Sequence, residues 1–118
     1  MLSSPAKIIL ALGLTLGQAA AKGKHAAFSG DMTFYTPGLG SCGVTNSASD
    51  HVVALSTSQI SGNCGKSINI HYNGKTASAK VEDTCAGCKS GDVDVSPAVF
   101  DSLADPDQGR VQVTWEFA

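Results

Sequence analysis

The segment VEDTCAGCKSGDVDVSPAVFDSL, residues 81–103, combines several carboxylates with two thiols, and two of its aspartates are placed to do chemistry. Asp83 and Asp94 stand near either end of a glycine-containing loop that carries Cys85 and Cys88. Two carboxylates across a groove can divide the roles of general acid and general base in glycoside cleavage, and an inverting reaction needs about 6.5–9.5 Å between them. This segment therefore carries most of the candidate chemistry of the chain.

The residues that follow the second carboxylate predict the elements that position the loop. Ser96 is expected to cap a helix by accepting a hydrogen bond from a free N–H, and Pro97 at the first helical position loses no hydrogen bond. Val99, Phe100 and Leu103 then supply one buried stripe. The segment is predicted to form a strand, the acidic loop, a second strand and a short capped helix.

The first strand of the fold is predicted to begin at Asp31. Side chains alternate between the two faces of a strand, so Met32 and Phe34 are expected to face the core and Thr33 and Tyr35 the opposite surface. A Pro-Gly pair and a further glycine then end the strand.

Further short strands are predicted along the rest of the chain. Residues 51–56 form an apolar run, and the Asn-Gly pair at 73–74 is a strong turn signal inside a hairpin over 67–81. The last predicted strand covers 110–117, and its alternation places Trp115 in the core. Many short strands with one short helix favour a closed β-barrel.

The N-terminal residues resemble a secretory signal more than a folded element. Segment 1–21 has a basic residue, Lys7, then the apolar core IILALGLTLG and small residues at the end. An apolar run of about ten residues is too short to cross a bilayer. Residues 22–29 show no periodicity and are predicted to be a flexible lead-in to one small domain over 30–118.

The charge of the chain without segment 1–21 argues against two classes of partner. Seven basic and ten acidic side chains remain, a net charge near −3, and no basic patch is left. We therefore expect no nucleic-acid partner and no binding to an anionic membrane.

Four cysteines in so small a secreted chain predict two disulfides, because the core alone gives limited stability. Three pairings are possible. A redox role for the Cys-x-x-Cys pair would require a helix N-terminus in a thioredoxin-like context, and the sequence offers none. A zinc site is also disfavoured, since the cysteines lack the doubled close spacing of a zinc ribbon. No metal or other cofactor is expected.

The pattern DxDxSPxxF, followed after a gap by GRVQVTWEF, resembles the double-psi β-barrel of expansins and their RlpA-like and barwin-related relatives. TFYTPGLGSCG is similar to the opening strand and turn of that family, and NCGKSINIHYNGKTASAKVEDTC to its middle hairpin. The match covers about residues 30–117, in family order. The resemblance implies a mainly β fold, a six-stranded double-psi β-barrel with one or two short helices, stapled by disulfides. By size, the chain is similar to the single-domain fungal loosenins.

The resemblance also implies a disulfide pairing. Cys42 of the GSCG turn should pair with Cys64 of NCGK. Cys85 and Cys88 would then pair with each other across the acidic loop.

The resemblance further implies roles for three residues. Asp94 matches the retained acidic residue of the family, Asp83 its partner on the preceding strand, and Thr33 the hydroxyl of the first strand. Tyr35 is a candidate sugar-stacking side chain. Two positions depart from the family pattern: Thr84-Cys85 replaces an aromatic, and a valine replaces the histidine before Asp94. The structural alternative is that both aspartates only cap loop amides.

Related endoglucanases take their general base from the first strand, where this sequence has a threonine and a tyrosine. The resemblance therefore implies a secreted, monomeric protein that binds and loosens cell-wall polysaccharide, cellulose or chitin, without hydrolysis. Residual lytic or glycosidase activity stays open. The second carbohydrate-binding domain of two-domain expansins is not expected. The alternative is a protein-binding module of the same barrel family, either a protease inhibitor or an effector.

Overall fold

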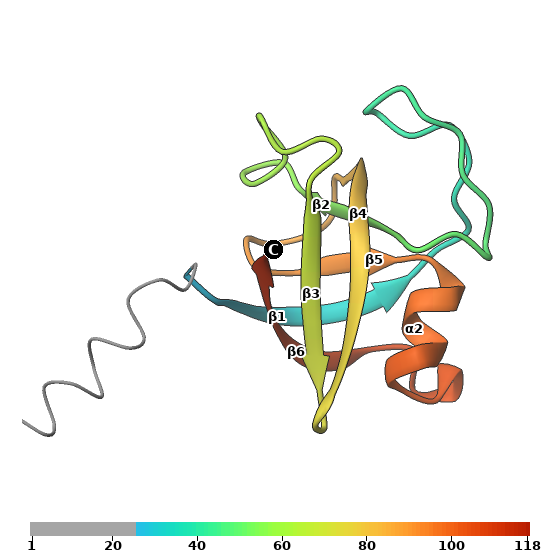
Figure 1. The fold of residues 1–118 in the computed structure, drawn as a ribbon, viewed down its shortest axis with the longest axis vertical. Coiled ribbons are helices and arrows are strands. Elements are labelled where there is room, and N and C mark those ends of the chain that lie inside the picture. The colour runs from blue at the N-terminus through green and yellow to red at the C-terminus, as the bar shows by residue number, and fades with distance from the viewer. Residues whose placement is uncertain (1–25) are drawn as a thin grey trace, which may run out of the picture.

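The computed structural model describes residues 26–118, which form one closed barrel (Figure 1). The predicted signal segment 1–21 and the first four residues of the lead-in lie outside the described residues. The elements in chain order are β1 (Phe28–Phe34), β2 (Val52–Ser56), β3 (Ser67–Tyr72), β4 (Lys75–Cys85), β5 (Val93–Val95), the helix α2 (Pro97–Leu103), the 3-10 turn η1 (Pro106–Gln108) and β6 (Val111–Phe117).

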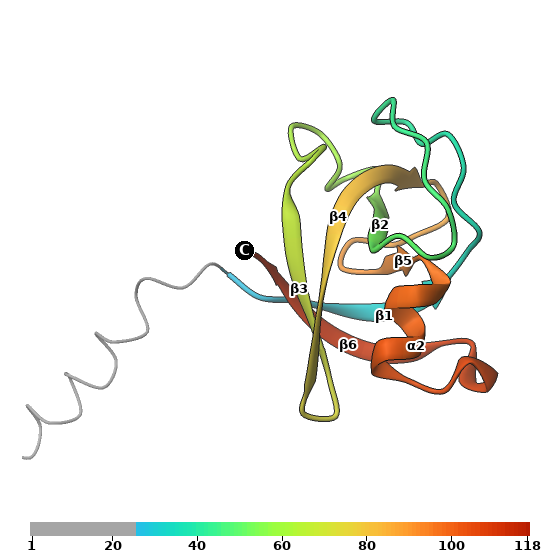
Figure 2. The ribbon, with the colours of Figure 1, turned by 45° about the vertical axis from the view of Figure 1, so that its right-hand side comes forward.

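The strands close in the order β1-β5-β2-β4-β3-β6, and β6 returns to β1. Two pairs are parallel, β1 with β5 and β2 with β4, and the other neighbours are antiparallel. Closure leaves no unpaired sheet edge around the barrel as a whole. Figure 2 shows α2 packed at one end of the barrel, while the hairpin of β3 and β4 extends past the barrel on another side. The predicted six-stranded barrel with a short helix is confirmed.

Alternate side chains of every strand point into the barrel and form its core. Trp115 is fully buried, as predicted, and its indole Nε1 donates a 2.8 Å hydrogen bond to the carbonyl oxygen of Gly91. This bond satisfies the polar atom that a buried tryptophan brings into a core. The other large, fully buried side chains are Phe100, Met32, Leu55, Ile68, Ile70, Leu103, Val53, Val81, Val93, Val95 and Val99.

The first strand differs from the prediction at both ends. It begins at Phe28, inside the predicted flexible lead-in, because the Phe28 ring packs 4.6 Å from the ring of Trp115. Phe34 was predicted to face the core with Met32, but 38% of it is exposed. The strand ends at this point, and the Phe34 ring packs against the ring of Phe100 of α2, with centroids 4.7 Å apart, outside the barrel core.

Ser96 is the N-cap residue of α2 as predicted, but the predicted hydrogen bond from the helix to its hydroxyl is absent. Ser96 precedes the helix in extended conformation, with Pro97 at the first position. The hydroxyl of Ser96 is fully buried and accepts a 3.4 Å hydrogen bond from the backbone N–H of Val52. Ser96 therefore joins the helix start to β2.

Both predicted disulfides are confirmed: Cys42 pairs with Cys64, and Cys85 pairs with Cys88. The first bridge joins the loop after β1 to the loop before β3, and the second closes the turn after β4. Within residues 26–118 no helix has the length and apolar character needed to cross a membrane.

Candidate functional site

The register of four strands brings the predicted site residues into one line. Thr33 of β1 lies opposite Asp94 of β5, Asp94 opposite Ala54 of β2, and Ala54 opposite Asp83 of β4. Paired residues point to the same face of a sheet. We call the line of Thr33, Asp94, Ala54 and Asp83 the acidic row. It lies on the outer side of the barrel, because the neighbours of its members along the strands, such as Val53 and Val95, fill the core.

A β-bulge in β4 sets the direction of Asp83. Val53 pairs with Val81, but the next residue of β2, Ala54, pairs with Asp83, so Glu82 is an extra residue in β4. A bulge shifts the alternation of a strand by one residue. Val81 is buried in the core, and without the bulge Asp83 would share that face. The bulge therefore turns the Asp83 carboxylate outward, onto the acidic row.

Thr33 and Asp94 are joined directly. The Thr33 hydroxyl donates a 2.9 Å hydrogen bond to Oδ1 of Asp94. The pKa of Asp94 is raised above its ordinary value of 3.8, mainly by burial and further by the charge of Asp83. The Thr33 hydrogen bond and the charge of Arg110 act in the opposite direction but do not cancel the rise. Asp94 is thus a partly buried carboxyl group that gives up its proton less readily than a solvated aspartate.

Asp83 is held by three donors. Its Oδ1 accepts backbone hydrogen bonds from Ser41 at 2.9 Å and from Thr84 at 2.8 Å. Its Oδ2 accepts a longer hydrogen bond, 3.4 Å, from the hydroxyl of Tyr35. Burial and then the nearby charge of Asp83 raise the pKa of Tyr35, so this hydroxyl stays protonated and remains a donor. Much of the accepting capacity of Asp83 is therefore used within the protein.

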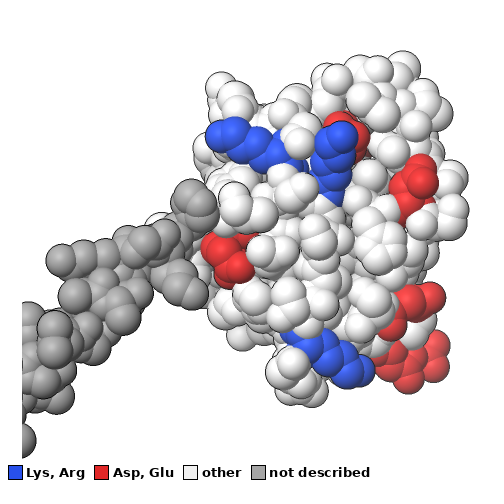
Figure 3. Space-filling model, viewed as in Figure 1, with Lys and Arg blue, Asp and Glu red and all other residues white. Residues whose placement is uncertain are grey.

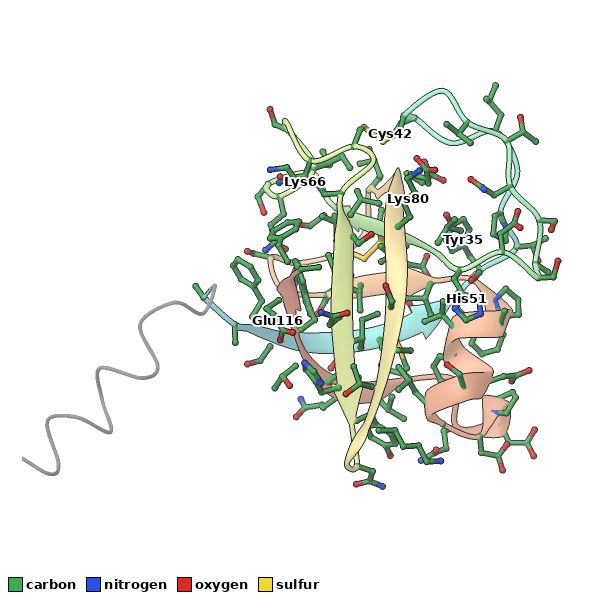
Figure 4. All side chains as sticks on the ribbon, in the orientation of Figure 1. Tyr35, Cys42, His51, Lys66, Lys80 and Glu116 are labelled. Atoms are coloured by element: carbon green, nitrogen blue, oxygen red, sulfur yellow. A yellow bond between two sulfur atoms is a disulfide. The ribbon has the colours of Figure 1, made fainter. Side chains whose placement is uncertain are left out.

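A loop over residues 36–51 docks against the bulge and borders the acidic row. The backbone N–H of Cys42 donates to the carbonyl oxygen of Glu82 at 3.2 Å, and Gly40 packs so tightly there that a Cβ would overlap the same oxygen. The Ser41 and Thr84 hydroxyls also share a 2.6 Å hydrogen bond. With the Cys42–Cys64 bridge, these contacts fix the loop beside Asp83. Figure 4 shows Cys42 on this loop.

Sequence reasoning missed two residues near the site. Glu82 is 94% buried as the bulge residue, and only the strand register shows the bulge. Arg110 lies far along the chain, yet its guanidinium bonds Asp31 at 3.0 Å and lowers the pKa of Asp94. The first strand therefore does carry a carboxylate, that of Asp31, but this carboxylate forms an ion pair with Arg110. The sequence held one possible sign of Arg110: it is a basic residue, after Gly109, between a stretch of acidic residues and the last strand.

The described residues contain no group of three or more histidine, cysteine, aspartate or glutamate side chains arranged to hold a metal ion. The four thiols are consumed in disulfides. On the face seen in Figure 3, small separate groups of acidic and basic side chains lie on a mostly uncharged surface.

This architecture identifies the fold class of the protein. A closed six-stranded barrel with two parallel pairs, one short helix and two disulfides is a double-psi β-barrel with an expansin-like fold. The expansin of Clavibacter michiganensis superposes on it with a TM-score of 0.73 and 25% identity, covering 79% of this chain and 50% of that protein. A mutant of that expansin has been solved in complex with cellohexaose, with the same TM-score.

The chain belongs to the family of the papain inhibitor of Streptomyces mobaraensis, with 37% identity over 100 residues, 75% of this chain and 70% of the inhibitor. The structure of the Streptomyces papain inhibitor superposes with a TM-score of 0.71 and 33% identity, covering 79% of this chain and 94% of that one. Allergen Asp f 7 of Aspergillus fumigatus is 41% identical over 96 residues, 75% of this chain, but the chain spans only 36% of that allergen. No family model matches the chain.

Proposed function

We propose that the chain is a secreted protein that binds and loosens cell-wall polysaccharide, cellulose or chitin, without hydrolysing it. The acidic row is the proposed contact surface. The observation that carries this proposal is the Thr33–Asp94 hydrogen bond at the surface of an expansin-like barrel. Two disulfides support secretion, because such bridges persist in oxidising compartments.

Asp94 is the carboxylate best suited to contact a sugar. Only its Oδ1 is engaged by a hydrogen bond within the described residues, so Oδ2 can accept from a sugar hydroxyl. The two oxygens of Asp83 are already held by the Ser41 and Thr84 amides and by Tyr35. In this proposal Asp94 binds the sugar, while Asp83 and Tyr35 shape the surface beside it.

The same contacts favour binding without cleavage. Inverting hydrolysis needs a protonated acid and a second carboxylate free to activate water. Asp94 has the raised pKa of an acid, but the candidates for the base are engaged: Asp83 by three donors and Asp31 by Arg110. A base for this reaction must hold the attacking water with a carboxylate oxygen, and both of these carboxylates are already engaged by donors of the protein. We therefore expect no turnover.

A second candidate function is inhibition of a cysteine protease, and a separate observation favours it. Leu39 and Val44 are 76% and 41% exposed on the loop that the Cys42–Cys64 bridge and the bulge hold in place. A rigid loop that presents apolar side chains loses little entropy when it binds a protein. The similarity to the papain inhibitor over nearly all of that chain supports this candidate too.

One comparison separates the two candidates. The wild-type chain, Asp94→Asn and Leu39→Asp are each incubated with insoluble cellulose, with insoluble chitin and with papain. The polysaccharide proposal expects depletion of the wild-type chain by one polymer, weakened in Asp94→Asn and unchanged in Leu39→Asp. Inhibition of papain that is lost in Leu39→Asp, with no depletion by either polymer, would replace it by the inhibitor function.

A further inference from the structure

A polar pocket lies on another part of the barrel than the acidic row, where β3 and β6 separate. The pairing of β3 with β6 ends at His71 and Thr114, but β6 continues along β1 through Gln112, while the β3–β4 hairpin continues to its turn. The hairpin tip consequently projects past the barrel (Figures 1 and 2). The gap is an open pocket of about 560 Å³. Its lining includes Ser29, His71, Tyr72, Asn73, Gln112 and Thr114, and we call it the hairpin pocket.

The hairpin pocket is built from a register-matched line of polar side chains. Ser29 of β1 pairs with Thr114 of β6, and Thr114 pairs with His71 of β3. Ser29, Gln112 and Thr114 are exposed, while the residues that alternate with them on β6 are buried. These side chains therefore point away from the core. The pocket occupies β3, β6 and β1, whereas the acidic row runs across β1, β5, β2 and β4.

The chemistry of the lining selects an uncharged ligand rich in hydroxyl groups. No lysine, arginine, aspartate or glutamate lines the hairpin pocket within the described part of the chain. The ring of His71 is fixed, because Nδ1 bonds the Thr76 hydroxyl at 2.8 Å and Nε2 bonds Glu116 at 2.8 Å. Gln112 and Asn73 each offer a donor and an acceptor, which suits a sugar hydroxyl that does both.

Tyr72 also lines the pocket, although it alternates with His71 along β3 and its side chain lies on the core face of that strand. Tyr72 is half-buried at the hairpin end and packs on the edge of the core, so its position is fixed.

We propose that the hairpin pocket binds a neutral sugar unit of a polysaccharide, at a site separate from the acidic row. It extends the proposed function, because a barrel with two sugar sites can contact two polymer chains, or two stretches of one chain. Linking two weak sites raises the overall avidity without any new contact. The two sites share no residue, so each can be lost without the other.

The test is a residue-resolved NMR titration of the protein with cellohexaose and with chitohexaose. One of them should shift the backbone signals of Thr114 and Tyr72 and the side-chain amide of Gln112. In the double variant Gln112→Ala/Thr114→Val, the affinity for the oligosaccharide obtained from these signals should fall about tenfold, as expected for two lost hydrogen bonds. Gln108→Ala removes a surface amide outside the pocket and should leave the affinity unchanged.

The outcomes distinguish this inference from the proposed function. Shifts at the hairpin pocket that persist in Asp94→Asn support a second site, even if the acidic row itself fails to bind. Shifts confined to Thr33, Asp94 and their neighbours would support the acidic row and overturn the hairpin pocket. The absence of shifts at both sites with both oligosaccharides would overturn both. Thermal unfolding of each variant checks that it is folded.

Discussion

Thr33 and Asp94, 61 positions apart in the chain, lie opposite each other on the parallel strands β1 and β5 and share a 2.9 Å hydrogen bond. The bond lies on the outer side of the barrel, next to a carboxylate from a third strand, Asp83, which the bulge at Glu82 turns outward. The candidate site is therefore a property of the barrel closure and not of one local motif.

The Thr33 hydroxyl should control the proton affinity of Asp94. Thr33→Val removes a donor that lowers the pKa of Asp94, so that pKa should rise further, and stability should fall by about 1 kcal/mol. Thr33→Ser keeps the hydroxyl and should resemble the wild-type chain. Carboxyl-carbon NMR titration measures both. An unchanged Asp94 pKa in Thr33→Val would show that the hydrogen bond is absent in solution.

Asp94 should make stability depend on pH in a defined direction. Its pKa is raised in the folded state, so the folded protein binds the proton more tightly than the unfolded chain. The corresponding stability is present below about pH 3.8 and is lost as pH rises through the folded pKa. Urea unfolding of wild type and Asp94→Asn across this range should show the variant gaining relative stability as pH rises. A constant difference between them would contradict the raised pKa.

Gly40 should be much less tolerant of substitution than its neighbour Gly38. A Cβ at Gly40 would overlap the Glu82 carbonyl oxygen at the bulge, whereas a Cβ at Gly38 meets open space. Gly40→Ala should therefore displace the loop over 36–51 and destabilise the protein by about 1–3 kcal/mol, with Gly38→Ala nearly neutral. Thermal unfolding of the pair checks this. Equal stability of the two variants would argue against the tight docking of the loop.

The two disulfides should contribute unequally. Cys42–Cys64 closes a loop across 22 positions and Cys85–Cys88 one across 3, so loop-closure entropy assigns about 3 kcal/mol to the first and about 2 kcal/mol to the second. Paired alanine variants, Cys42→Ala/Cys64→Ala and Cys85→Ala/Cys88→Ala, compared by urea unfolding, test the order. A larger loss from removing Cys85–Cys88 would reverse it.

Much of the fold was predictable because its signals are local. The Asn-Gly turn at 73–74 and the alternation that buries Trp115 each act within a few residues. The disulfide pairing and the barrel topology came from the family resemblance, since spacing alone leaves three pairings open.

The unpredicted features depend on contacts distant in sequence. The bulge at Glu82 appears only when β4 is aligned against β2, and Ser96 bonds Val52 in place of the helix. Phe28 joins the first strand because Trp115 lies beside it. Local propensity cannot report such partners. The engagement of Asp83 by loop amides belongs to the same group.

Whether the barrel acts on a polymer through Asp94 without cleaving it is tested most directly by one paired assay. Purified wild type, Asp94→Asn and the exposed control Asp107→Asn are applied to cellulose and chitin fibres, and fibre loosening and released reducing sugar are measured in the same samples. We expect loosening by wild type and Asp107→Asn, less in Asp94→Asn, and no sugar release by any of them. Steady sugar release by the wild type, abolished in Asp94→Asn, would show a hydrolase or lytic enzyme and contradict the account.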